Sequence, residues 1–151
     1  VDGTSKTLAI SEVKAFTPRS QDVTGMPTAA PTNPADIAAL MGNGWSVDGG
    51  HTEWVCGRSL HIGFTTTFPP NTNVPYVRDG KTYDVDISST REGVVPAATT
   101  YAVVTSRSHH SGIVNCSFMD GSVRPVTSEI SAETWKALGS RAGGEAAAAI
   151  E

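Results

Sequence analysis

Residues 113–126, IVNCSFMDGSVRPV, carry the clearest structural signal in the chain. Apolar residues alternate with polar ones on both sides of Asp120-Gly121, and an Asp-Gly pair between two alternating runs is typical of a β-hairpin. A two-residue loop of type I′ would pair Phe118 with Val123 across the hairpin. That register places five side chains on one apolar face, which we expect to be core: Val114, Cys116, Phe118, Val123 and Pro125.

The remainder of the chain indicates short strands and helices between loops. We expect extended segments where alternating, β-branched or aromatic residues gather: 6–13, 54–58, 61–68 and 99–106. Two short helices are expected, one from the Asn33-Pro34 cap to Gly42 and one from the Ser131 cap to Gly139. Segments rich in Pro, Gly or polar residues are expected to be loops: 17–32, 42–50 and 76–98, the last with Asp79-Gly80 as a candidate turn.

This pattern of elements predicts an α+β fold around one antiparallel sheet. Residues 1–141 are expected to form a single globular domain, because a chain of this length buries one core. The Gly- and Ala-rich residues 142–151 show no capped pattern, so we expect them to form a flexible tail.

Composition excludes several classes of partner. The chain of 151 residues has 11 Lys and Arg against 15 Asp and Glu, a formal net charge of −4. A nucleic-acid or anionic-lipid surface needs a basic face, so neither is expected as a partner. No apolar run reaches the roughly 18 residues of a membrane span.

No motif of a hydrolase or of a phosphate-binding loop is present. The pattern G-x-S-x-G is absent, and the glycines of residues 42–50 match neither G-x-G-x-x-G nor a P-loop. Ser108-His109-His110-Ser111 brings serine and histidine together, but proximity in sequence is not catalytic geometry. We therefore expect no catalytic residue and no enzyme activity.

Candidate metal ligands are few. His51 and Glu53 form an H-x-E pattern that would share one face of a strand, yet the H-E-x-x-H and P-C-x-x-C motifs that would support it are absent. Asp84 and Asp86 are candidate calcium ligands without an EF-hand loop. The alternative for His51 and Glu53 is a solvated pair or an imidazole–carboxylate hydrogen bond. We expect no resident metal or cofactor. If a metal is bound, these four residues are the candidate ligands and calcium is the candidate cation.

The chain has two cysteines, Cys56 and Cys116, which are too far apart in sequence for a C-x-x-C pair. A disulfide between them would fit an oxidising compartment. The alternative is two free thiols that pack as small apolar side chains. Periodicity turns Cys116 inward but says nothing about a distance, so both alternatives stay open.

His110 and Asp120 are separated by a predicted strand. Ten residues of extended chain span about 33 Å, so the imidazole and the carboxylate cannot share a proton. We expect each to stabilise its own turn, Asp120 through backbone hydrogen bonds and His110 through packing or a carbonyl bond.

The spacing of His110, nine residues, and Asp120-Gly121 resembles the signature of a bacterial family, the prepilin-type processing-associated domain with its H-x9-DG pattern. Further similar stretches cover almost the whole chain: DGTSKTL at 2–8, HTEWV at 51–55, SSTREG at 88–93, SRSHHSG at 106–112 and TWKALGSRAGGE at 134–145. Lys6 departs from the asparagine usual in the first of these.

The resemblance implies a pilin-like antiparallel sheet with short helices, whose long N-terminal pilin helix is missing from this chain. Members of the family carry a prepilin-like leader and are anchored in the inner membrane by that helix, so the abrupt start at Val1 is expected to reflect a missing anchor. The globular part is then extracytoplasmic, in the periplasm or at the cell surface, and touches the membrane only through the absent helix.

The same resemblance implies a non-enzymatic, pseudopilin-like role in a type IV pilus or a type II secretion-like system, with other pilin-like subunits or secretion components as partners. The activity of the family is unknown, so His110, Asp120 and Gly121 carry over as a structural signature only. The alternative function is a ligand-, carbohydrate- or metal-binding surface module, with Trp45, Trp54 or Tyr76 as sugar-stacking candidates.

Overall fold

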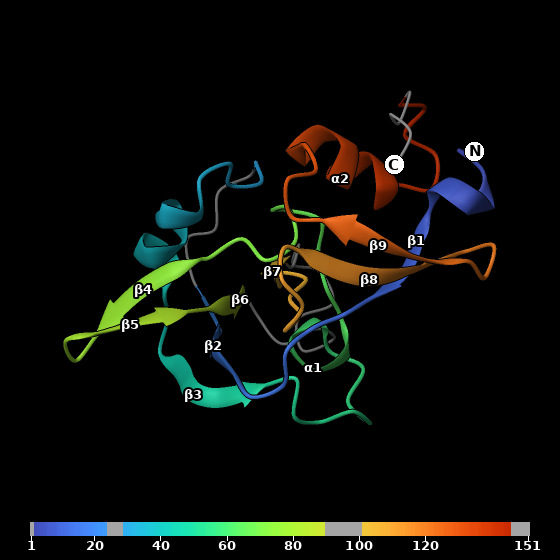
Figure 1. Ribbon diagram of the computed structural model, residues 1–151. Coiled ribbons are helices and arrows are strands. Elements are labelled where there is room, and N and C mark those ends of the chain that lie inside the picture. The colour runs from blue at the N-terminus through green and yellow to red at the C-terminus, as the bar shows by residue number, and fades with distance from the viewer. Residues whose placement is uncertain (1, 24–28, 90–100, 146–151) are drawn as a thin grey trace, which may run out of the picture. The chain divides into compact units, whose positions relative to one another are not determined.

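The computed structural model describes residues 2–23, 29–89 and 101–145 (Figure 1). Parts of the predicted loops 17–32 and 76–98, of the predicted strand 99–106 and of the predicted tail 142–151 therefore lie outside the described residues. Short strands with a few short helices confirm the α+β fold. The strands form three sheets, where one antiparallel sheet was expected. None of the helices in the described part has the length and apolar character needed to cross a membrane.

The chain divides into two compact units, each made of separate segments. Unit 1 is formed by three of them: Val1–Val13, Thr65–Thr72 and Thr105–Glu151. Unit 2 is formed by Lys14–Phe64 and Asn73–Val104. Each unit has its own sheet and its own set of buried apolar side chains, and each is described separately below.

Unit 1 is built on an antiparallel sheet in which β8 lies between β1 and β9 (Figure 1). Its elements in chain order are η1 (Thr4–Lys6), β1 (Leu8–Ser11), β8 (Ile113–Phe118), β9 (Val123–Thr127) and α2 (Ala132–Leu138). The predicted hairpin and last helix are therefore confirmed. The Ser131 side chain caps α2 by accepting from the Thr134 N–H at 3.1 Å, as the sequence predicts.

The register of the β8–β9 hairpin differs by one residue from the prediction. Ser117 pairs with Val123 and Cys116 with Arg124, and the Phe118 N–H donates to the Ser122 carbonyl at 2.9 Å. Gly121 has a φ of 83°, while Asp120 does not have a positive φ, so the loop is a three-residue turn ending in a left-handed glycine. The predicted two-residue type I′ loop is wrong.

This shift reverses the two faces of β9. Val123 is 68% exposed, whereas Val126, which pairs with Val114, is completely buried. Pro125 is likewise exposed, and the guanidinium of Arg124 lies over the Phe118 ring at 4.9 Å. A change of one residue in register moves every side chain of a strand to the opposite face, so the core assignment of Val123 and Pro125 is corrected.

Strand β1 is bent by an irregularity of register between Leu8 and Ile10. Leu8 is buried and Ile10 is 67% exposed, although simple alternation predicts the same face for both. An extra residue in one strand switches the alternation beyond it, which accounts for the difference.

Unit 2 contains a mixed four-stranded sheet of order β3-β2-β6-β7 and a separate hairpin of β4 and β5. Strands β2 and β6 are parallel, and the other neighbours are antiparallel. The elements are β2 (Thr17–Gln21), η2 (Pro34–Leu40), β3 (Gly44–Gly50), α1 (Ser59–Ile62), β4 (Pro75–Arg78), β5 (Lys81–Asp84), β6 (Asp86–Ser88) and β7 (Ala102–Val103).

Several elements of unit 2 differ from the prediction. Strands β2 and β3 form where loops were expected, because glycines let the two backbones approach: a Cβ at Gly44 would lie 2.7 Å from the Gln21 carbonyl oxygen. The predicted strands 54–58 and 61–68 do not form, and helix α1 overlaps the second of them at its last two residues, His61 and Ile62. Strands β4, β5 and β6 lie almost entirely within the predicted loop 76–98. The helix predicted at Asn33 is present but is of the 3-10 type, with the Asn33 side chain accepting from the Ala35 N–H at 3.0 Å.

The two-residue type I′ geometry expected at Asp120-Gly121 occurs instead between β4 and β5. Asp79 has a φ of 50° and Gly80 of 73°, and Arg78 pairs directly with Lys81. Both central residues of a type I′ turn require a positive φ, which this Asp-Gly pair satisfies.

Candidate functional site

His110, the first residue of the signature, contacts Glu12. Its Nε2 lies 3.4 Å from Glu12 Oε1, and the same carboxylate accepts from the Asn115 backbone N–H at 2.8 Å and its carboxamide at 3.2 Å. These contacts, the Asn115 backbone N–H foremost and His110 to a smaller extent, hold the pKa of Glu12 below its usual value. His110 thus ties the segment before β8 to the residue after β1 through a carboxylate, where packing or a carbonyl bond within its own turn was expected.

Asp120, at the other end of β8, makes its contacts within its own turn. Its Oδ1 accepts from the Ser122 hydroxyl at 2.7 Å and from the Ser122 N–H at 2.9 Å. The hydrogen bond from the Ser122 hydroxyl, followed by the one from its N–H, lowers the pKa of the Asp120 carboxyl. Arg124 Nη2 lies 3.9 Å from the other carboxylate oxygen. The two signature residues therefore have separate partners, and of the two only Asp120 holds its own turn.

Asn71 is a polar residue of unit 1 that the sequence analysis did not single out. Its carboxamide donates to the Ile113 carbonyl at 3.2 Å and to Ser128 Oγ at 2.9 Å, and accepts from the Ser108 N–H at 2.9 Å. Asn71 also has a φ of 58°, which asparagine tolerates better than most residues. It joins three segments of unit 1, and the only hint in the sequence is its position after Pro69-Pro70.

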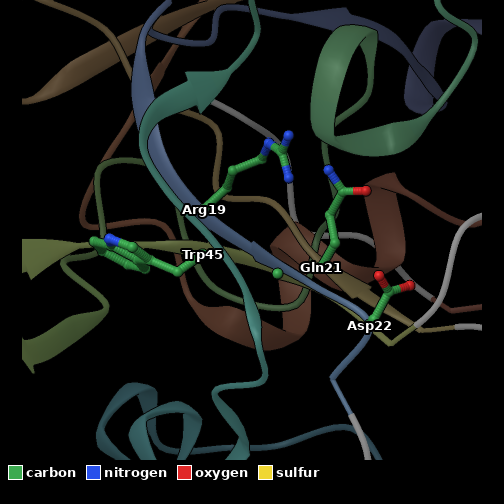
Figure 2. Close-up of a pocket in the computed structure, with 5 residues that line it drawn as sticks. Arg19, Gln21, Asp22 and Trp45 are labelled. Carbon is green, nitrogen blue, oxygen red and sulfur yellow. The ribbon is translucent and has the colours of Figure 1, made fainter.

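A polar pocket lies in unit 2 where β2 meets the start of β3 (Figure 2). It has a volume of about 220 Å³ and is lined by Arg19, Gln21, Asp22, Gly44 and Trp45. The Arg19 and Gln21 side chains point toward one another in Figure 2. When the Gln21 carboxamide is oriented with its oxygen toward Arg19, this oxygen accepts a hydrogen bond from Arg19 Nη2 at 2.7 Å. This volume is below the roughly 300–1,000 Å³ of sites for larger organic ligands, so the pocket suits a small polar molecule.

The Trp45 ring is largely engaged by its own neighbours. It contacts Tyr76 at 5.5 Å and Tyr83 at 5.2 Å between ring centroids, and the Arg78 guanidinium lies 5.4 Å from its centroid. Figure 2 shows the ring extending away from the Arg19 and Gln21 head groups. Trp45 pairs with Ser20 across the sheet, so its side chain lies on the opposite face of the sheet from those of Arg19 and Gln21. The aromatic ring is part of a packed cluster on the β4–β5 hairpin.

A second cluster of unit 2 contains Glu53, Cys56 and His61. One ligand atom from each, a carboxylate oxygen, Sγ and an imidazole nitrogen, lie within 4.8 Å of one another. The turn before α1 brings Glu53 and Cys56 together, since the Cys56 N–H donates to the Glu53 carbonyl at 2.9 Å. His61 is the third residue of α1, and its Nε2 lies 3.9 Å from Glu53 Oε2.

His51 supports this cluster without joining it. Its backbone N–H donates to the Leu60 carbonyl at 2.8 Å, and its Nδ1 lies 3.2 Å from the His61 carbonyl oxygen. On its other side, Nε2 is 4.0 Å from the buried Asp86 carboxylate. His51 has a φ of 54°, so the chain turns there, and the predicted sharing of one strand face by His51 and Glu53 is wrong.

The remaining candidates are placed as follows. Asp84 Oδ1 accepts from the Val74 N–H at 2.8 Å, which gives this carboxylate a structural role. Cys56 and Cys116 are both free cysteines in the structure. The Cys116 thiol is buried in unit 1 with Sγ 3.2 Å from Ser11 Oγ, and burial raises its pKa. Cys56 is a candidate disulfide partner by sequence, and no sequence motif indicates it as a metal ligand.

The chain belongs to a family described as a protein of unknown function, DUF1559, whose family model matches residues 1–133. No curated protein and no solved structure matches the chain. The match covers β1, the unit 2 clusters and the complete β8–β9 hairpin, and the family description assigns no activity to any of them.

Proposed function

We propose that this chain is the non-enzymatic globular domain of a pseudopilin-like protein of the H-x9-DG type. It acts outside the cytoplasm, in a type IV pilus or type II secretion-like system, by assembling with other pilin-like subunits or secretion components. The contacts of the signature support a structural role, because His110 binds Glu12 and Asp120 binds Ser122. The His110 side chain ties the segment before β8 to Glu12, and the Asp120 side chain stabilises the turn after β8.

The observation that carries an assembly role is an apolar row on the exposed face of the unit 1 sheet. Ile10 and Val123 both pair with Ser117, one from each side, so the three side chains share a face. Ile10 is 67% exposed and Val123 is 68% exposed. These two apolar side chains lie two strands apart, with Ser117 between them. Exposed apolar side chains grouped on one face are typical of contact surfaces, and a pilin-like neighbour would bury this row.

A photo-crosslinking amino acid at Val123 of the full-length protein, expressed in its native host, tests this contact. We expect a crosslinked adduct whose second component mass spectrometry identifies as a protein with a prepilin-type N-terminus. The matched control is Val77, 65% exposed on β4 of unit 2. Absence of a pilin-like adduct at Val123, or an equal yield from Val77, would contradict the proposal.

The full reading frame of the gene tests the anchor separately. A prepilin cleavage motif followed by roughly 20 apolar residues is expected upstream of Val1. A reading frame without this segment would remove the pseudopilin assignment, whatever the crosslinking shows.

A second candidate function is binding of a small polar ligand such as a sugar, which the pocket at Arg19 and Gln21 favours. Calorimetry against a panel of mono- and disaccharides tests it. Binding that is lost in Gln21→Ala and kept in Trp54→Ala would support this pocket, since Trp54 is 84% exposed and is not among its lining residues. Binding lost only in Trp54→Ala would place the ligand elsewhere.

A further inference from the structure

Glu53, Cys56 and His61 bring together three different kinds of metal ligand. Bonds of about 2.0–2.3 Å to zinc place the donor atoms of a tetrahedral site roughly 3.3–3.8 Å apart. His61 Nε2 and Glu53 Oε2 are already 3.9 Å apart, and the three ligand atoms lie within 4.8 Å of one another. A contraction of about 1 Å, within the reach of side-chain rotation, would bring all three onto one ion.

The positions of the three side chains suit a site with one open side. The His61 side chain is 1% exposed, whereas the Glu53 side chain is 58% exposed. A buried histidine provides a rigid ligand, and the exposed carboxylate can rotate to meet the ion. Three protein ligands leave the fourth tetrahedral position for water, on the solvent side of the cluster.

The contacts of His51 hold the backbone that carries the His61 side chain. The His51 N–H donates to the Leu60 carbonyl, and its Nδ1 lies 3.2 Å from the carbonyl oxygen of the next residue, His61. Asp86, 1% exposed, lies on the far side of the His51 ring. A backbone held in this way restricts where the His61 imidazole can lie, and supporting residues behind the ligands are usual at protein metal sites.

We propose that Glu53, Cys56 and His61 bind a zinc ion at the turn before α1, with His51 as a positioning residue. One thiolate, one carboxylate and one neutral imidazole balance the two positive charges of the ion. Mixed sulfur and nitrogen ligands select zinc over calcium and magnesium, which prefer oxygen. In the part of the chain that the structure describes, no other group of three Cys, His, Asp or Glu ligand atoms comes as close together.

Cobalt substitution of the tag-free, reduced and chelator-stripped chain tests the site. We expect one Co²⁺ per chain, with a thiolate-to-cobalt absorption in the near ultraviolet, tetrahedral bands in the visible, and displacement by Zn²⁺. Cys56→Ser should lose the thiolate absorption, and Glu53→Gln should weaken binding at least about tenfold, as changes of metal-site partners do. Neither side chain is buried, so both variants should keep the far-ultraviolet circular dichroism of the parent chain.

The matched control is Cys116→Ser, which removes the other thiol of the chain from the core of unit 1. This variant should retain the wild-type cobalt spectrum. The proposal is overturned if the wild-type chain shows no thiolate absorption, if Cys56→Ser keeps it, or if Cys116→Ser loses it. As an independent readout, a chelator should lower the Tm of the zinc-loaded wild type and leave that of Cys56→Ser unchanged.

Discussion

At the scale of single residues, Glu12 explains why a histidine precedes β8. The carboxylate receives two hydrogen bonds from Asn115 and faces His110, so three segments of unit 1 meet at one charge. The sequence analysis gave His110 a structural role but not its partner, because residues almost a hundred positions apart show no periodicity in common. Cys56 and His61 were missed as a pair because they lie in two separate predicted strands, 54–58 and 61–68, where the structure has a turn and helix α1.

The lowered pKa of Glu12 makes its contribution to stability depend on pH. Because the folded-state pKa lies below the ordinary value of 4.5, the contribution is complete above that value and is lost as the pH falls through the folded-state pKa. Glu12→Gln keeps an acceptor for Asn115 and removes the charge, so we expect it to lower the free energy of unfolding by about 1 kcal/mol at neutral pH.

Urea unfolding of wild type and Glu12→Gln at neutral pH and near pH 3 measures this effect. The difference between the two proteins should shrink at the acid end. Glu129→Gln, an exposed residue of unit 1, is the control and should match wild type at both. A difference of equal size at both pH values would contradict a role for the Glu12 charge.

At the scale of elements, the two Asp-Gly pairs show how far turn chemistry determines a hairpin. Asp79-Gly80 forms the two-residue turn that an Asp-Gly pair favours, whereas Asp120-Gly121 belongs to a three-residue loop. The side chain of Ser122 binds Asp120, and the observed register buries Val126 of β9 opposite Val114, so packing and hydrogen bonding select the second register. The sequence predicted both turns correctly as turns, and the register of one of them wrongly.

Gly121→Ala tests the left-handed position of the longer loop. A Cβ there would meet nothing within 4 Å, so the expected loss of about 1 kcal/mol comes from the φ of 83° alone. Gly57→Ala is the matched control, because it too has open space but no positive φ, and it should be neutral or slightly stabilising. Equal unfolding midpoints for the two variants would show that the strain at Gly121 is absent.

At the scale of the whole molecule, each unit has a core of its own. In unit 1 the largest completely buried side chains include Trp135 and Phe118, and in unit 2 they include Ile37 and Ile87. The chain passes between the units at several points, so neither unit is a continuous segment. Hydrophobic periodicity identified the buried face of β8, at Val114, Cys116 and Phe118, but it did not reveal the division into units.

Paired valine substitutions test the corrected faces of the hairpin. Val114→Ala removes a side chain with no exposed surface, and we expect it to lower the free energy of unfolding by about 2 kcal/mol. Val123→Ala, which the predicted register would have made equally costly, should change it by less than about 0.5 kcal/mol. Chemical denaturation of both variants measures the difference, and similar losses would support the predicted register instead.

The sequence alone determined the features that depend on neighbouring residues: the α+β class, the caps at Asn33 and Ser131, the turns at both Asp-Gly pairs, and the inward face of β8. Only the tertiary structure decided which strands pair, where β1 changes face, and which polar side chains meet. Caps and turns are short-range, because a side chain there binds a backbone group a few residues away. The pairing of β2 with β3 and the Glu12–His110 contact depend on how separate segments pack, and no local pattern encodes that packing.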